Sequence, residues 1–192
     1  NHEFYQTMKI ILIGIQGAGK STQGNLLSKK LQIPYLSTGH IFRDIAKEHT
    51  PLGRYIKEVM HAGALVPNQK TIAIVNDYLD RPEYDKGFIL DGFPRTLEQA
   101  EALKEEIDEV IYLKVSDKEA LWRLSYREEE GAEDRDDDTL AAVRHRIELF
   151  HKHTEPVLNF FHKKRRLLEV DGEKSIDAIY AEIMKKIRVA SE

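Results

Sequence analysis

The chain has 192 residues, of which 41% are hydrophobic and 32% are charged, and its net charge is −4. This length allows one domain with a sizeable core, and the negative balance argues against nucleic acid or an anionic membrane as the main partner. The absence of cysteine excludes disulfides and cysteine-ligated zinc. No apolar run approaches the roughly 20 residues of a membrane span. The first seven residues are polar and lack the apolar stretch of a signal peptide, so we expect a cytoplasmic protein.

Short apolar runs and helical patterns alternate along the chain. The apolar runs predict strands at 8–13, 34–36, 88–90, 110–115 and 167–170. A helical pattern passes through Leu26, Leu27 and Leu31, and others predict helices at 39–49, 52–62, 67–79, 96–106, 117–129, 139–161 and 175–187. This alternation predicts an α/β fold with a parallel sheet covered by helices on both faces. Trp122 is expected in the core, and the acidic stretch 128–138 is expected to be exposed.

A glycine-rich loop joins the first predicted strand to the first predicted helix. Residues 14–21 read GIQGAGKS and match the phosphate-loop pattern GxxxxGK[ST] in full. Glycines let backbone N–H groups turn toward a phosphate, and the following helix adds its positive amino-terminal end. Lys20 is expected to reach the β- and γ-phosphates of a bound nucleotide, and the Ser21 hydroxyl to ligate Mg²⁺. The alternative interpretation is a tight turn before a helix.

A carboxylate ends the third predicted strand. Asp91 follows the apolar run 88–90, where a second oxygen ligand for Mg²⁺ is expected beside a phosphate loop. A carboxylate at the end of a strand can also be a simple turn residue. Together with the phosphate loop, the position favours a metal-binding role for Asp91.

Three further motifs resemble those of the adenylate kinases, which are nucleoside monophosphate kinases. Residues 37–43 read STGHIFR, 63–67 read GALVP and 88–96 read FILDGFPRT. The resemblance extends from about residue 8 to residue 189. It implies a P-loop NTPase-type core with a five-stranded parallel sheet, a small helical insertion that binds the monophosphate, and a short lid. The implied segments are 8–36, 68–127 and 139–190 for the core, 37–67 for the insertion, and 128–138 for the lid.

The resemblance also assigns residues to two nucleotide sites, with arginines prominent because their planar fork donates to two phosphate oxygens. Exposed arginines would otherwise be interpreted as surface ion pairs. Catalytic roles are implied for Lys20, Arg95, Arg127, Arg135 and Arg146. ATP binding is implied for Gly14, Gly17, Ala18, Gly19, Lys20, Ser21, Thr22, Arg123 and Arg127. AMP binding is implied for Thr38, Arg43, Val66, Gly92, Arg95, Gln99, Arg135 and Arg146. Binding of Mg²⁺, partly through water, is implied for Ser21 and Asp91.

The implied reaction is the reversible, Mg²⁺-dependent transfer of the terminal phosphoryl group of ATP to AMP, giving two ADP. Thr38 and the threonine that follows Arg95 resemble the AMP-specific branch of the family. Two alternatives stay open, namely a kinase for UMP or CMP and a nucleotide-binding protein without catalytic activity. The implied partners are ATP, AMP and ADP, with neither nucleic acid nor membrane. A monomer is expected, and the short lid without cysteine predicts no zinc.

Two residues depart from the pattern of the family. Gln16 stands where the family usually has proline, and His40 stands where it usually has an aspartate that helps to order water around Mg²⁺. An imidazole cannot replace that carboxylate without changing the local charge. We therefore expect an active enzyme with a raised Mg²⁺ requirement. The alternative is that His40 points away from the site and only packs against or caps a helix.

Overall fold

A computed structural model describes residues 7–62, 64–129 and 140–190 of the chain. Its centre is a five-stranded sheet in the order β2-β3-β1-β4-β5, and every neighbouring pair is parallel. The strands are β1 (Met8–Ile13), β2 (Tyr35–Ser37), β3 (Gly87–Asp91), β4 (Glu109–Lys114) and β5 (Leu167–Asp171). Each predicted strand is therefore confirmed to within one residue at either end.

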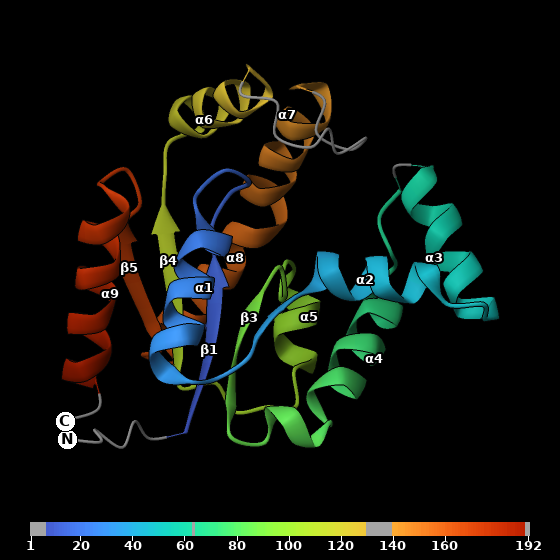
Figure 1. Cartoon of the computed structure of the whole chain (residues 1–192), viewed down its shortest axis with the longest axis horizontal. Helices are drawn as coiled ribbons and strands as arrows, with labels where there is room; N and C mark the ends of the chain where they lie inside the picture. The colour runs from blue at the N-terminus through green and yellow to red at the C-terminus, as the bar shows by residue number, and fades with distance from the viewer. Residues whose placement is uncertain (1–6, 63, 130–139, 191–192) are drawn as a thin grey trace.

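Helices cover both faces of this sheet, as predicted (Figure 1). The helix α1 (Lys20–Leu31) lies beside α9 (Ile176–Ala190) on one face. The helices α4 (Asn68–Leu79), α5 (Leu97–Ala102) and α8 (Glu155–Lys163) pack in a row on the other face. Two further pairs are α2 (Thr38–Lys47) with α3 (Pro51–His61), and α6 (Asp117–Glu129) with α7 (Leu140–Leu149). Among the described segments, no helix combines the length and the hydropathy of a membrane span.

The sequences of the central strands follow from this two-sided cover. Ile10 and Ile11 of β1, Ile89 and Leu90 of β3, and Ile111 of β4 are all fully buried. Because consecutive residues in a strand point to opposite faces, a strand covered on both sides needs an unbroken apolar run rather than an alternating one. The central strands therefore form a rigid frame for the loops at their carboxyl ends.

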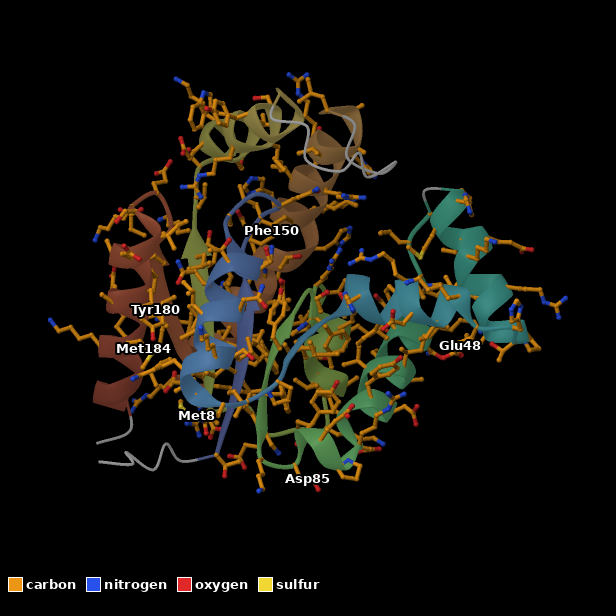
Figure 2. All side chains as sticks on the ribbon, viewed as in Figure 1. Met8, Glu48, Asp85, Phe150, Tyr180 and Met184 are labelled. Carbon is orange, nitrogen blue, oxygen red and sulfur yellow. The ribbon has the colours of Figure 1, made fainter. Side chains whose placement is uncertain are left out.

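The order of the strands places two of these loops side by side. Strands β1 and β3 are neighbours, with Leu12 paired to Asp91. The chain leaves β1 through α1 on one face and leaves β3 through α5 on the other face. In open parallel sheets, ligands bind at the carboxyl ends of the strands where connections diverge in this way. Met8 and Asp85 lie at the opposite end of the sheet (Figure 2).

The predicted helix 139–161 is not continuous. After α7, a π-helical segment, η2 (Phe150–Thr154), precedes α8, which has Pro156 in its first turn. Proline lacks an N–H group and its ring clashes with the carbonyl group four residues earlier, so the helix widens locally. Phe150 is buried at this junction and stacks on Tyr112 of β4, with ring centroids 6.4 Å apart (Figure 2). The prediction missed the interruption because it gave no weight to Pro156.

Two other predictions need correction. The helix predicted for 96–106 ends at Ala102, because Leu103 turns to an extended conformation and the side chain of Asn76 bonds the Ala102 carbonyl at 3.4 Å. Trp122 was expected in the core, but it is 60% exposed on α6. Its ring stacks on that of Tyr126, one helical turn away, with centroids 5.6 Å apart. Helical spacing alone does not show whether such an aromatic pair faces the core or the solvent.

Candidate active site

The loop between β1 and α1 has the backbone of a phosphate cradle. Gly17 and Gly19 have φ angles of 87° and 91°, in the left-handed region that favours glycine. The Ala18 N–H group donates to the Ile15 carbonyl oxygen at 3.0 Å, which tightens the turn. Helix α1 begins directly after this turn, at Lys20. The N–H groups of its first turn, including those of Ser21 and Thr22, have no acceptor within the helix, so this end attracts an anion.

Lys20 folds back over the same loop. Its Nζ atom donates to the carbonyl oxygens of Gly14 at 2.9 Å and Ile15 at 3.4 Å. The same atom lies 4.0 Å from Oδ1 of Asp91. Burial lowers the pKa of Lys20, and the nearby carboxylate of Asp91 acts in the opposite direction. The lysine charge is thus held beside the cradle, where the phosphates of a nucleotide would stabilise it.

Asp91 lies between Lys20 and an unpredicted partner, Tyr35. The hydroxyl group of Tyr35 donates to Oδ2 of Asp91 at 2.5 Å, while Oδ1 faces Lys20. The Ser21 hydroxyl and the Asp91 carboxylate are hard oxygen donors of the kind that Mg²⁺ prefers. Within the described residues, no three His, Asp or Glu side chains form a cluster that could hold a metal ion. This donor set fits an ion that arrives with a nucleotide and keeps water and phosphate oxygens as its other ligands.

Thr38 and Arg95 meet at the carbonyl group of Gly92. The Thr38 hydroxyl donates to this oxygen at 3.1 Å, and Nε of Arg95 donates to it at 2.8 Å. Gly92 has a φ angle of 85°, and a Cβ atom there would lie 2.4 Å from Oγ1 of Thr38. Only glycine allows this close approach without strain. The predicted AMP-binding residues Thr38, Gly92 and Arg95 are therefore brought together.

Gln99 lies at the centre of a directional chain of hydrogen bonds. Its Oε1 atom accepts from the backbone N–H of Arg95 at 2.8 Å, and its Nε2 donates to Oδ1 of Asn68 at 2.9 Å. Nδ2 of Asn68 then donates to Oε2 of Glu98 at 2.9 Å. A backbone N–H can only donate and a carboxylate can only accept, so the orientation of both amides is determined. Val66, just before α4, contributes a carbonyl group that accepts from Thr71 at 3.4 Å.

Arg146 adds a second guanidinium beside Arg95. Its Nη1 donates to Oε1 of Gln16 in the phosphate loop at 3.0 Å. Desolvation by the surrounding protein lowers the pKa of Arg95, although part of the side chain is exposed. The charge of Asp91 raises this pKa, and the charge of Arg146 lowers it. Lys20, Asp91, Arg95 and Arg146 thus form one cluster of three cations and one carboxylate.

Arg123 of α6 also contacts the phosphate loop. Its Nε bonds Glu119 at 3.0 Å, and its Nη2 donates to the Gly172 carbonyl oxygen at 2.8 Å. Its Nη1 lies 3.5 Å from the carbonyl oxygens of Gly17 and Ala18. The predicted ATP-binding residues of the loop and Arg123 are therefore neighbours.

The other predicted site residues are less closely placed. Arg43 lies on the exposed side of α2, with its guanidinium near Gly39. The side chain of Arg127 and all of Arg135 lie outside the described residues. The roles of these two arginines, like those of the other site residues, stay predictions. The ring of His40 does not cap a helix. The imidazole is 70% exposed and lies 4.0 Å from the Asp44 carboxylate, while the backbone N–H bonds Ser37.

Three supporting residues were not predicted from the sequence: Tyr35, Asn68 and Thr154. The Thr154 hydroxyl donates to the Arg95 carbonyl oxygen at 2.8 Å, so the π-helical segment holds the backbone of a predicted phosphate-binding residue. Pro156 could have indicated a break near Thr154. No local signal singled out Tyr35 or Asn68, because each acts on a residue far away in the chain.

The same π-helical segment is tied to α6 through His151. Nε2 of His151 lies 2.8 Å from Oδ1 of Asp117, the first residue of α6, and Nδ1 lies 2.5 Å from Oε1 of Glu155. The hydrogen bond to Glu155, followed by that to Asp117, raises the pKa of His151. A protonated imidazole can donate from both nitrogens, so it suits two carboxylates.

We expect His151→Ala to lower the free energy of unfolding more at pH 5.5 than at pH 9. The raised folded-state pKa gives a stabilising contribution that is complete below the ordinary value of 6.5 and is lost as the pH rises through the folded-state value. Because these groups are about half exposed, the loss should be only about 0.5–1 kcal/mol at pH 5.5. Denaturant unfolding at both pH values measures it, with His153→Ala as the control. An equal loss at both pH values would contradict this interpretation.

The fold and the site define the class of the protein. A parallel sheet with a glycine-rich phosphate cradle at its switch point, and cations beside it, is a P-loop nucleotide-binding protein. The model of the adenylate kinase family matches residues 12–166. An adenylate kinase of Methanocella arvoryzae is 38% identical over 94% of this chain and 99% of its own length. Those of Clostridium botulinum strain Loch Maree and Archaeoglobus fulgidus are 40% and 39% identical, each over 92% of this chain and 96% of its own length.

The chain therefore belongs to the adenylate kinase family. Membership makes it a phosphotransferase that acts on nucleotides. The predicted P-loop fold and the predicted family are both confirmed. The two alternatives, a pyrimidine monophosphate kinase and a catalytically silent protein, are not favoured by these matches.

Proposed function

We propose that this chain transfers the terminal phosphoryl group of ATP to AMP, reversibly, with Mg²⁺ bound to the nucleotide. The observation that carries the proposal is the cluster of Lys20, Arg95 and Arg146 around Asp91 at the mouth of the phosphate loop. A single triphosphate would need only the loop and its lysine. Arg95, which bonds the Gly92 carbonyl beside Thr38, and Arg146, whose charge acts on Arg95, provide cations for a second, acceptor phosphate.

ATP is proposed to bind through the loop 14–22 and Arg123, because the loop offers backbone donors and Arg123 lies directly behind it. AMP is proposed to bind on the side of Thr38, Val66, Gly92 and Gln99, with Arg43 and Arg95 on its phosphate. One N–H of the Gln99 amide is used by Asn68 and its oxygen by Arg95, which leaves the second N–H for a base.

The chemistry proposed for this site needs no general base. The acceptor is a phosphate oxygen that is already ionised at neutral pH. The work of the protein is to hold donor and acceptor in line and to neutralise the charge that spreads over the transferring group. Lys20, Arg95 and Arg146 supply that neutralisation, with Arg127 and Arg135 as further candidates. Mg²⁺, held by Ser21 and Asp91 partly through water, would add positive charge at the phosphates.

The proposed division of the chain follows the same roles. Residues 37–67 form the monophosphate-binding insertion, and they include the α2–α3 pair, which projects to one side of the sheet (Figure 1). Residues 128–138 are the proposed short lid, of which 130–138 lie outside the described residues. The role proposed for it is to exclude water, since water would also accept the phosphoryl group. The helix α6 extends to Glu129, so the first two lid residues belong to its last turn. The core comprises the remaining segments.

We expect AMP to be the preferred acceptor. Thr38 and Gln99 are both buried and hydrogen-bonded beside Arg95, so a base would meet fixed polar groups rather than flexible ones. The measurement is kcat/KM for AMP, UMP, CMP and GMP with ATP as the donor. A pyrimidine monophosphate in first place would make the assignment of the acceptor wrong. Absence of transfer to any of the four would make the proposed reaction itself wrong.

We expect His40→Asp to lower the Mg²⁺ concentration needed for half-maximal rate. The substitution restores a carboxylate in the first turn of α2, directly after Thr38 and Gly39. The exposure of the imidazole and its proximity to Asp44 also allow His40 to be a bystander. Magnesium titrations of both proteins at pH 6 and pH 8 separate the two cases. Identical curves at both pH values would mean that His40 has no part in metal use.

A further inference from the structure

Tyr35 contacts Asp91 but has no role in the proposed phosphoryl transfer as described above. It is the first residue of β2, and that strand pairs with β3 so that Tyr35 lies beside Ile89 and Ser37 beside Asp91. The ring extends along this edge until its hydroxyl group reaches Oδ2 of Asp91 at 2.5 Å. A phenol hydroxyl carries its proton at neutral pH, so Tyr35 donates this hydrogen bond and the Asp91 carboxylate accepts it.

The position of the ring depends on a glycine in α1. Gly24 is buried, and a Cβ atom there would lie 2.4 Å and 2.7 Å from two carbon atoms of the Tyr35 ring. Those distances are far below van der Waals contact, so any larger residue at 24 would push the ring aside. Glycine costs a helix interior roughly 1 kcal/mol relative to alanine. The helix tolerates that cost here, and the space gained is filled by the tyrosine ring.

The hydrogen bond controls which way Asp91 can turn. The last torsion of an aspartate is broad and roughly two-fold, so a lone carboxylate at this position would rotate readily. With Oδ2 held by Tyr35, Oδ1 faces Lys20 across 4.0 Å, close enough to attract but not to form a hydrogen bond. Without the hydroxyl, the carboxylate would be free to turn and pair directly with Lys20. Such a pair would withdraw one charge from the metal and the other from the phosphates.

We infer that Tyr35 is a positioning residue for Mg²⁺-nucleotide binding, which it serves by holding the Asp91 carboxylate away from Lys20, with Gly24 providing the space for its ring. The inference rests on the proposed function, because it requires Asp91 to serve the metal. It extends that function to two residues, in β2 and α1, that act through Asp91.

The test is calorimetric binding of ADP to the whole chain with Mg²⁺ and, separately, with a chelator in place of the metal. The ratio of the two affinities is the gain due to Mg²⁺. Tyr35→Phe should reduce this gain on the order of 10-fold, as expected when a supporting partner of a metal ligand is lost. Binding without Mg²⁺ should change little. Tyr112→Phe, which removes a hydroxyl from another half-buried tyrosine, should leave both affinities as they are.

A second substitution, at Gly24, moves the ring without removing the hydroxyl group. Gly24→Ala should reduce the same gain, and it should add no further reduction in a chain that already carries Tyr35→Phe. Thermal unfolding shows that each variant is folded under the conditions of the titrations. A further reduction in the double variant would contradict the route through the hydroxyl group.

Asp91→Asn separates failure of this inference from failure of the proposed function. If Asp91→Asn abolishes the gain and Tyr35→Phe preserves it, the inference on Tyr35 is overturned and the metal role of Asp91 stands. If Tyr35→Phe weakens binding equally with and without Mg²⁺, the tyrosine only shapes the nucleotide site and the inference is again wrong. If Asp91→Asn itself preserves the gain, the proposed metal role of Asp91 fails, and the inference fails with it.

Discussion

Lys20→Ala is expected to lower kcat on the order of 10³-fold while leaving the fold intact. The lysine lies on the phosphate cradle, where its Nζ donates to the Gly14 carbonyl oxygen and lies 4.0 Å from Oδ1 of Asp91. Its ammonium group would neutralise the negative charge on the transferring phosphoryl group as the reaction proceeds. Stability should not suffer, because burial lowers the pKa of Lys20 and the folded site therefore does not favour its charge.

The measurement is a coupled assay for ADP formed from ATP and AMP, together with a thermal melt. Lys29→Ala is the matched control, since Lys29 is an exposed residue in the last turn of the same helix. It should leave both kcat and the melting temperature unchanged. A Lys20→Ala variant that keeps more than about a tenth of the wild-type kcat would show that another residue neutralises these phosphates.

Arg146→Ala is expected to lower kcat on the order of 10²-fold or more, with a smaller effect on the KM of either nucleotide. The guanidinium is held by Gln16 at 3.0 Å, at the edge of the phosphate loop, and its charge acts on Arg95. It is thus placed between the two proposed nucleotide sites. Charge that develops on the transferring group would draw on it more strongly in the transition state than in either ground state.

Arg144→Ala is the control for this second experiment, because Arg144 is an exposed residue of the same helix. Its removal changes the net charge by the same amount without touching the phosphate loop. If Arg146→Ala raised only the KM values, Arg146 would be a binding residue that serves substrate and transition state equally. If both variants lost the same activity, the effect would come from the loss of a positive charge anywhere on this helix, and not from the position of Arg146.

The parts of this protein that could be predicted from its sequence are those that rest on local patterns. The phosphate loop is readable because its eight residues carry the turn, the lysine and the start of the helix in one uninterrupted stretch. The strands are readable because burial on both faces demands continuous apolar runs. Asp91 is readable from its place at the end of such a run. Arginines at the positions of the family motifs completed the predicted site.

What the pattern could not show is how these residues support one another. Tyr35 reaches Asp91 across 56 positions, Thr154 reaches Arg95 across 59, and Arg146 reaches Gln16 across 130. Each contact depends on the order of the strands and on which face each helix covers. No short segment encodes these features, because they result from the packing of the whole core. The exposure of Trp122 was likewise set by how neighbouring helices pack, and not by the spacing of apolar residues along the chain. The widened turn before Pro156, in contrast, could have been inferred from the proline itself.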